Sequence, residues 1–209
     1  MMNIENPYRI ELKKKILIAA RSMFFKDGIR KVKMDDIANH LKISKRTLYE
    51  IYDNKEVLLH GVLQLNEEEH LKRLKAFDTP GTNVINIIIE AFNLKTQEVS
   101  AINPAFYEDI SRYPSLIEKI RERKQKQAGQ TKEFVKRGIE EGYFLPNIKI
   151  EILMQLADAS VHFVMSQQLY KTYSMKDIFY TYIMVYARGI CTLKGIELIE
   201  QYLEELDQK

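Results

Sequence analysis

The stretch MDDIANHLKISKRTLYEIYD, residues 34–53, decides the fold. Its apolar residues recur at helical spacing on both sides of an interruption at Lys42, which predicts two short amphipathic helices joined by a tight turn. Ala38 is the small residue needed where the helices cross, and Ser44 supplies a hydroxyl N-cap for the second helix. The pattern indicates a helix-turn-helix, although this stretch alone leaves open a helical hairpin inside any all-helical core.

The second helix of this pair carries polar side chains at its outward positions. Arginine or lysine bound to guanine is the commonest specific contact between protein and DNA, so we expect Lys45 and Arg46 to reach base edges. Residue types that contact phosphates and base edges occupy all of these positions: Lys45, Arg46, Thr47, Tyr49 and Glu50.

The charge of the chain is divided unevenly. Residues 1–60 hold 13 Lys and Arg against 8 Asp and Glu, a net of +5, whereas residues 61–209 hold 19 against 21, a net of −2. The basic excess therefore lies in the same part of the chain as the helix-turn-helix, which favours a polyanionic partner for that part.

Composition predicts an all-α protein of the reducing cytoplasm. The chain has 45% hydrophobic residues but only 8 glycines and 5 prolines, and β-type alternation is hard to find. The single cysteine, Cys191, excludes an internal disulfide, and we expect it to be a buried apolar side chain. The most apolar tract, residues 178–193, contains Arg188 and is too short to span a membrane.

A helix over residues 9–27 precedes the helix-turn-helix and presents one apolar face. Gly28 is suited to end this helix. A further helix starts at Lys55, and Asp53 and Asn54 are suited to cap it. The helices can then enclose a small core, for which we predict Met23, Phe24, Ile37, Leu41, Leu48 and Tyr52.

The order of residues between Lys13 and Leu59 resembles the DNA-binding domain of the TetR family of bacterial transcriptional regulators. The matching pattern is K-x-x-I-L-x-A-A-x-x-M-F-x-x-x-G, followed by D-I-A-x-x-L-x-I-S-K-R-T-L-Y-x-x-Y-x-N-K-E-x-L-L. The resemblance implies a recognition helix over residues 44–52 in the major groove of DNA. It also implies phosphate contacts by Thr47, Tyr49 and Lys55, the last at a helix N-terminus.

The chain departs from the family pattern at three positions. Lys33 stands where threonine usually caps the first helix of the pair, so we expect Asp35 or Asp36 to replace that cap. Lys42 stands where glycine is frequent because the turn favours a left-handed conformation, at a cost of roughly 1 kcal/mol. Arg46 also stands where glycine is frequent. We expect Lys33 and Lys42 to add phosphate contacts.

Proline and glycine punctuation divides the remainder of the chain into helices. We predict helices over residues 55–77, 82–101, 104–112, 114–141, 149–171 and 175–206, with a DNA-binding domain at 1–55 and an effector-binding and dimerisation domain at 56–209. The helix at 114–141 is charged along most of its length, which is typical of a solvated face rather than of a second nucleic-acid site.

The last two predicted helices are apolar on every side, so each must be covered on every side. An intersubunit four-helix bundle achieves this in a short chain, and the family resemblance implies the same homodimer, which would read a palindromic double-stranded DNA operator. We expect Arg188 to pair with Asp158 or with a carboxylate of the partner, or else to bind an acidic effector. The predicted interface residues are Leu153, Val161, Met165, Tyr182, Tyr186 and Arg188.

The resemblance also implies a small-molecule effector bound inside the C-terminal domain. For every candidate lining residue, a place in the hydrophobic core is the competing interpretation, and Asp158 and His162 share a helix face as a candidate buried structural pair. The candidates are Phe77, Phe92, Phe106, Tyr107, Tyr113, Met154, Asp158 and His162.

The sequence contains no catalytic constellation, and we expect neither enzymatic activity nor a cofactor. Glu67 and His70 form a single Glu-x-x-His unit, for which an exposed polar helix face is favoured over metal binding, so no metal is expected. The sequence therefore predicts a repressor released from its operator by an effector. An activator, a DNA-binding protein controlled by another protein, and a helical-bundle binding or metal-enzyme module remain alternatives.

Overall fold

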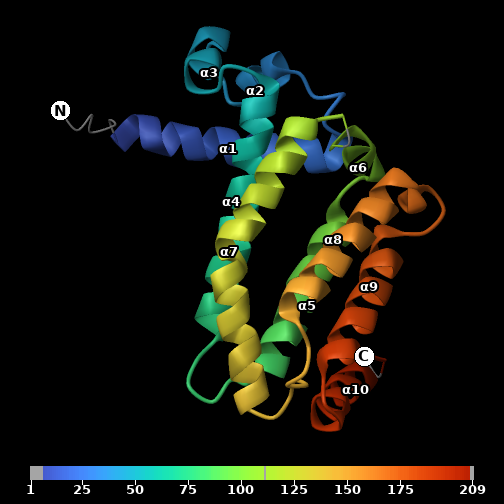
Figure 1. The fold of residues 1–209 in the computed structure, drawn as a ribbon. Helices are drawn as coiled ribbons and strands as arrows, with labels where there is room; N and C mark the ends of the chain where they lie inside the picture. The colour runs from blue at the N-terminus through green and yellow to red at the C-terminus, as the bar shows by residue number, and fades with distance from the viewer. Residues whose placement is uncertain (1–6, 111, 208–209) are drawn as a thin grey trace. The chain divides into compact units, whose positions relative to one another are not determined.

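The computed structural model describes residues 7–110 and 112–207, and the predicted all-α fold is confirmed over these residues (Figure 1). An isolated β-bridge pairs Phe144 with Cys191. In the described part of the chain, no helix is long and apolar enough to cross a membrane. The helices are α1 (Pro7–Asp27), α2 (Met34–His40), α3 (Lys45–Ile51), α4 (Lys55–Phe77), α5 (Val84–Ala101), α6 (Pro104–Ile110), α7 (Pro114–Glu140), α8 (Ile150–Ser166), a 3₁₀ turn (Leu169–Lys171), α9 (Met175–Ile190) and α10 (Leu193–Asp207).

The chain forms two compact units. The first contains α1, α2, α3, the part of α4 up to Glu69, and α6. The second contains the rest of α4, most of α5, and the chain from Glu118 onwards. The two units are defined by contacts between residues and do not correspond to continuous segments of the chain. The domain boundary predicted after residue 55 therefore stays a prediction.

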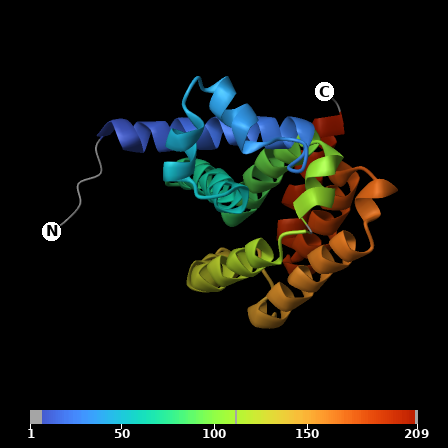
Figure 2. The same ribbon diagram turned by 90° about the horizontal axis from the view of Figure 1, so that it is seen from above.

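The first unit is built around α1, which runs as one unbroken helix (Figure 2). Phe24, Ile37 and Leu48 are fully buried as predicted, whereas Met23, Leu41 and Tyr52 of the predicted core are only half-buried. Tyr52 keeps part of its ring accessible, and burial of the remainder raises the pKa of its phenol to about 12.

Gly28 ends α1, as the sequence predicted. It has a φ of +85° and donates its backbone N–H to the carbonyl of Phe24 at 3.0 Å. A Cβ atom at this position would lie 3.0 Å from the Cβ of Ala105 and 3.2 Å from a carboxylate oxygen of Asp109, so α6 also approaches closely here. Both the turn and the close approach require glycine.

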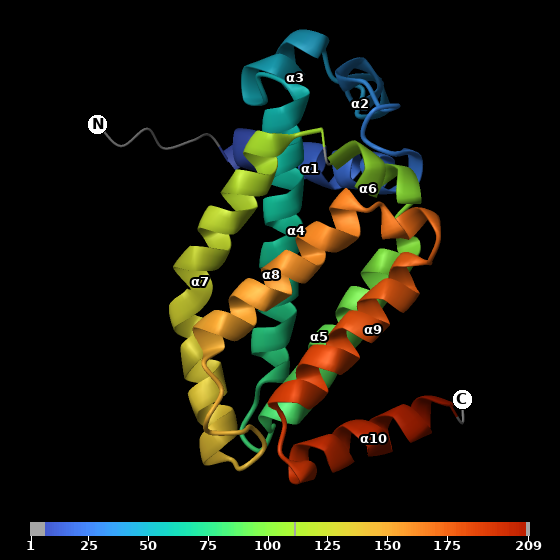
Figure 3. The same cartoon turned by 45° about the vertical axis from the view of Figure 1, so that its right-hand side comes forward.

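The second unit has its core between α5, α9 and α10. Phe92 of α5 stacks on Phe179 of α9, with ring centroids 6.0 Å apart. α10 leaves the end of α9 at a sharp angle (Figure 3). The buried cluster consists of Val84, Ile85, Phe92, Phe144, Met184, Ala187, Cys191 and Ile199.

The prediction of one helix over residues 175–206 is wrong, because the chain breaks at Cys191 and Thr192. Cys191 is extended, the N–H of Leu145 donates to the carbonyl of Ile190 at 2.9 Å, and the N–H of Thr192 donates to the carbonyl of Tyr143 at 2.8 Å. These bonds replace helical ones with bonds to the loop after α7. Cys191 is buried as predicted, and burial raises the pKa of its thiol to about 11.

The helix predicted at 149–171 is also shorter in the structure. It ends at Ser166 because Gln168 adopts a left-handed conformation with a φ of +53°, after which only a 3₁₀ turn follows. The predicted helices at 82–101 and 104–112 agree with α5 and α6 to within two residues at each end.

We expect Gly138→Ala to destabilise the second unit. A Cβ at Gly138 would overlap the buried ring of Phe144, so the ring must move, at a cost of about 1–3 kcal/mol. Gly129→Ala on the same helix is the matched control, because nothing lies within 4 Å of the point that its methyl group would occupy. It should stabilise the protein by about 0.5–1 kcal/mol through helix propensity. Urea unfolding of both variants measures the difference, and equal stabilities would contradict this account.

Candidate nucleic-acid interface

The helix-turn-helix is formed by α2 and α3, and α3 is fixed at its start by a hydroxyl cap. The backbone N–H of Thr47 donates to Oγ of Ser44 at 3.0 Å, which confirms Ser44 as the N-cap. The two hydroxyl groups also bond to each other at 2.7 Å. One residue further along, Leu48 is fully buried, so the cap and one apolar contact set the orientation of the helix.

The start of α2 lacks a side-chain acceptor at its N-cap position, Lys33. The carboxylate of Asp36 instead accepts a hydrogen bond from the backbone N–H of Lys33 at 2.8 Å. This is the half of a capping box that an acidic residue can supply, and it confirms the expected replacement of the cap. Asp35, the other candidate, pairs with Lys45 instead.

Lys42 adopts the left-handed conformation that the sequence predicted, with a φ of +55°. The turn is closed by two backbone bonds: Lys42 N–H donates to Asn39 at 3.1 Å, and Ile43 N–H donates to Ala38 at 3.0 Å. The lysine side chain is exposed and does not relieve the backbone strain.

The two cations at the start of α3 are each paired with a carboxylate. Nζ of Lys45 lies 2.5 Å from Oδ2 of Asp35, and this hydrogen bond raises the pKa of Lys45. Nε of Arg46 lies 2.8 Å from Oε1 of Glu50, and this hydrogen bond raises the pKa of Arg46. Sequence reasoning missed both partners. The spacing of four residues on one helix could have revealed Glu50, whereas Asp35 is found only once the turn is built.

The other side chains predicted to meet DNA lie on α3 or in the segments next to α2 and α3. Lys33, Lys42, Thr47 and Tyr49 all keep part or most of their surface accessible to solvent. The contacts predicted for these residues with DNA remain predictions.

Lys55 lies apart from that group, at the start of α4. Its ammonium group donates to the carbonyl of Arg30 at 3.4 Å, and its partial burial lowers its pKa, which nearby Asp109 and Asp36 partly oppose. Arg30 is held on its other side, because its backbone N–H donates to the buried carboxylate of Asp109 at 2.6 Å. A half-buried cation at a helix start is suited to a phosphate. No signal in the sequence pointed to Asp109.

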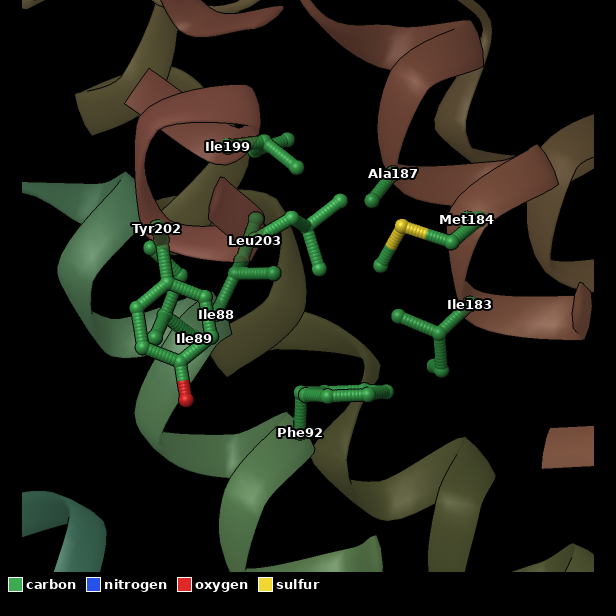
Figure 4. A pocket seen from close by; sticks show the side chains of 9 residues that line it. All are labelled: Ile88, Ile89, Phe92, Ile183, Met184, Ala187, Ile199, Tyr202 and Leu203. Carbon is green, nitrogen blue, oxygen red and sulfur yellow. The ribbon is translucent and has the colours of Figure 1, made fainter. Parts of the chain in front are cut away.

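Two of the predicted effector-binding residues line hollows in the second unit. Phe92 lines an apolar cavity of about 10 Å³ between α5, α9 and α10, and Phe77 lines an open groove of about 220 Å³. In Figure 4, side chains of α9 face those of α10, with side chains of α5 completing the wall. The cavity is lined by Ile88, Ile89, Phe92, Ile183, Met184, Ala187, Ile199, Tyr202 and Leu203.

The other six candidates are divided between the two units. Phe106, Tyr107 and Tyr113 belong to the first unit, where Phe106 is buried and meets the ring of Phe25 edge-on at 5.0 Å, as a core residue would. Met154 on α8 is half-buried. Asp158 and His162 on the same helix are exposed in the single chain, so the expected buried pair is wrong there.

Arg188 forms an ion pair that the sequence did not predict, because its guanidinium lies 2.6 Å from Oε1 of Glu200 on α10. Pairing with a carboxylate of a partner subunit and binding of an acidic effector stay predictions. The break after α9 turns α10 back and brings Glu200 within reach. Of the other predicted interface residues, Val161 is exposed in the single chain. The remaining four are half-buried there: Leu153, Met165, Tyr182 and Tyr186.

The Glu-x-x-His unit is not the exposed polar face that was expected. Nε2 of His70 lies 2.9 Å from Oε2 of Glu98, and both side chains are largely buried. Lys95 pairs with the same carboxylate at 2.6 Å. Among the residues that the structure describes, no group of three or more His, Cys, Asp or Glu side chains is arranged to hold a metal ion.

Two helices joined by a left-handed turn, the second capped and carrying exposed cations at its start, define a helix-turn-helix DNA-binding protein. Residues 16–62 match the family described as "Bacterial regulatory proteins, tetR family". The helix-turn-helix transcriptional regulator YdeS of Bacillus subtilis (strain 168) is 31% identical over 149 residues, which cover 68% of this chain and 72% of YdeS.

Solved structures share the fold at low sequence identity. A Saccharomonospora viridis protein in complex with choline has a TM-score of 0.64 and 16% identity, and covers 88% of this chain and 99% of its own. The fatty acid degradation regulator FadR of Bacillus halodurans has a TM-score of 0.61 and 17% identity, with 87% and 95% covered. The chain belongs to the TetR family of bacterial transcriptional regulators.

We expect Lys42→Gly to raise the stability of the protein above that of the wild type. Lys42→Ala should be less stable than Lys42→Gly. Glycine removes the left-handed strain but loses more entropy on folding, for a net gain of about 0.5–1 kcal/mol, whereas alanine keeps the Cβ atom and the strain. Both variants remove the same positive charge, so they should lose the same duplex affinity. Thermal unfolding and DNA titration of the pair separate the two effects, and equal melting temperatures would argue against strain at this turn.

Proposed function

We propose that the protein is a cytoplasmic homodimeric repressor that binds a palindromic operator through two copies of α3 and leaves it when a small molecule binds the C-terminal domain. The observation that supports it best is the exposure of α3. Its cap and its single buried leucine fix the helix, while its cations and Tyr49 face solvent. A helix held in this manner can enter the major groove without rearranging its own core.

The homodimer is supported by the apolar surface of α8 and α9. α8 contains no buried residue in the single chain, although it is rich in large apolar side chains. Phe163 is 58% exposed on α8, and Val185 is 64% exposed on α9. Several large apolar side chains exposed on two neighbouring helices favour an interaction site, and a second copy of the same two helices would cover them as a four-helix bundle. The exposed apolar residues here are Ile152, Leu156, Val161, Phe163, Tyr180 and Val185.

A twofold dimer constrains the spacing of its two recognition helices. Successive major grooves on one face of DNA lie about 34–36 Å apart, so both copies of α3 must adopt that separation to bind one operator. An effector that favours another separation weakens binding, and a coupling free energy of about 1–3 kcal/mol changes operator occupancy several-fold.

Effector binding is supported by the hollows at Phe92 and Phe77. The cavity at Phe92 holds no more than about one water molecule, so a larger ligand there requires α9 and α10 to separate. The groove at Phe77 is larger, and two carboxylates, Glu90 and Glu205, line it beside Tyr202. A structural neighbour was solved with choline, which makes small organic cations a reasonable first set of compounds to test.

We expect the purified protein to enrich a palindromic sequence from random duplexes. Its affinity for that duplex should fall by about 10³- to 10⁵-fold between about 50 and 200 mM salt, as contacts to about six to ten phosphates require. Lys33→Ala should reduce the magnitude of the slope of log affinity against log salt by about 1, since each phosphate contact releases about one counterion.

Lys75→Ala is the control for the salt slope, because it removes an exposed cation outside the first unit. This variant should leave the slope unchanged. Failure to enrich any sequence, or an affinity independent of salt, would reject DNA binding by this surface.

We expect Val185→Asp to convert the dimer into monomers. A charge at this exposed position of α9 would have to be buried against the partner, which costs several kcal/mol without a counter-charge. Ile10→Asp on α1 is the matched control, because that side chain is 53% exposed and belongs to the first unit, whereas α8 and α9 belong to the second. Sedimentation velocity reads the oligomeric state, and a Val185→Asp variant that stayed dimeric would place the interface elsewhere.

A further inference from the structure

The charges on α3 are arranged against its own dipole. Lys45 and Arg46 lie in its first turn, where the helix end is positive, and Glu50 lies in its last turn, where the helix end is negative. The order of the ion pair, with the arginine four residues before the glutamate, is also the weaker one for helix stability. The placement of Glu50 therefore costs stability, and a role outside the fold explains it better.

The geometry of the pair leaves the two terminal nitrogens of the Arg46 guanidinium available to DNA. Oε1 of Glu50 accepts its hydrogen bond from Nε of Arg46 at 2.8 Å. The two terminal nitrogens of Arg46 make no hydrogen bond with any residue that the structure describes, and the arginine side chain is 88% exposed. Those two nitrogens form the fork that binds O6 and N7 of guanine.

We propose that Glu50 is a positioning residue for base recognition, which holds the guanidinium of Arg46 by its Nε and directs its terminal fork to a guanine in each half of the operator. This inference rests on the proposed function, because it assumes that α3 enters the major groove. Glu50 acts through Arg46 and thereby determines specificity.

The carboxylate also penalises the competing arrangement of Arg46. In water an exposed pair contributes little, but inside the groove the same pair is desolvated and strengthens. If Arg46 turned to a phosphate, Glu50 would face phosphates and base acceptors without a donor, which is unfavourable. Arg46 bound to guanine keeps the Nε bond intact. Glu50 therefore lowers the affinity for random DNA more than the affinity for the correct sequence.

The carboxylate could instead accept a hydrogen bond directly from N4 of a cytosine, without Arg46. A double-mutant cycle separates the two roles. Direct reading by Glu50 persists when Arg46 is removed, whereas positioning disappears.

The experiment uses the duplex that the wild-type protein enriches from a random pool, together with duplexes that carry single base-pair changes. Arg46→Ala should lower discrimination at one G·C pair of each half-site by about tenfold. Glu50→Ala should lower discrimination at the same pair severalfold and raise the affinity for a random duplex. In the Arg46→Ala background, Glu50→Ala should have no further effect on discrimination. With Arg46 present, Glu50→Gln keeps an acceptor oxygen and should therefore retain part of the discrimination that Glu50→Ala loses.

Glu11→Ala is the matched control. Glu11 pairs with Lys15 on α1 at 2.8 Å, also four residues apart, with side chains 66% and 62% exposed. Glu11→Ala removes the same charge from the same unit as Glu50→Ala does, and it should leave discrimination between the duplexes unchanged. Melting temperatures of the Glu50 variants should equal or exceed that of the wild-type protein, so loss of folding cannot imitate the result.

Each contrary result has its own meaning. Discrimination unaffected by Glu50→Ala overturns the proposal, as does an equal loss in the Arg46→Ala background, which would assign direct reading to Glu50. If the wild-type protein enriches no duplex, the proposed function fails first and this inference fails with it. Enrichment by the wild-type protein followed by either of the first two results rejects the inference alone.

Discussion

The attachment of α3 depends on the burial of Leu48. Of the seven residues in this helix, all of which the structure describes, Leu48 is the one that is buried. Removing a leucine side chain from water contributes about 1.5–3 kcal/mol, whereas each exposed ion pair on the helix contributes about 0–1 kcal/mol. One apolar contact and the cap at Ser44 therefore decide where the helix lies. Thr47 and Ile51 are half-buried, and the exposed side chains that remain can serve recognition: Lys45, Arg46, Tyr49 and Glu50.

Two carboxylates of the first unit hold the surroundings of that helix by accepting hydrogen bonds from the backbone. Asp36 caps α2, and Asp109 fixes the backbone of Arg30, whose carbonyl in turn meets Lys55. Bonds to a buried carboxylate are stronger than exposed ion pairs because water does not compete for them. The predicted phosphate-binding lysine thus contacts a loop whose backbone is held by a hydrogen bond to the buried side chain of Asp109.

The sequence predicted the features that depend on neighbouring residues, and it failed where distant residues decide. Helical periodicity, the Ser44 cap and the left-handed Lys42 are local, and all three are confirmed. The break between α9 and α10 is decided by hydrogen bonds from a loop nearly fifty residues earlier, at Tyr143. Thr192 was nevertheless a missed local signal, since its hydroxyl accepts from the N–H of Gly195 at 3.3 Å as an N-cap does. The pairing of Lys45 with Asp35 requires the turn to be built first.

The proposed dimer links the stability of α8 to operator binding. The core of the second unit lies between α5, α9 and α10, and α8 contributes no buried residue to a single chain. The residues of α8 are half-buried or exposed in the single chain, so in the proposed dimer association would add to the stabilisation that its own subunit provides. Dilution of the protein would then expose the apolar side chains of α8 to water and separate the paired recognition helices at once. Because a single copy of α3 contacts only half of a palindrome, the affinity gained from two linked half-sites is lost together with the dimer. In the proposed dimer, the covering of the apolar side chains of α8 and the reading of a palindromic operator would therefore depend on the same association.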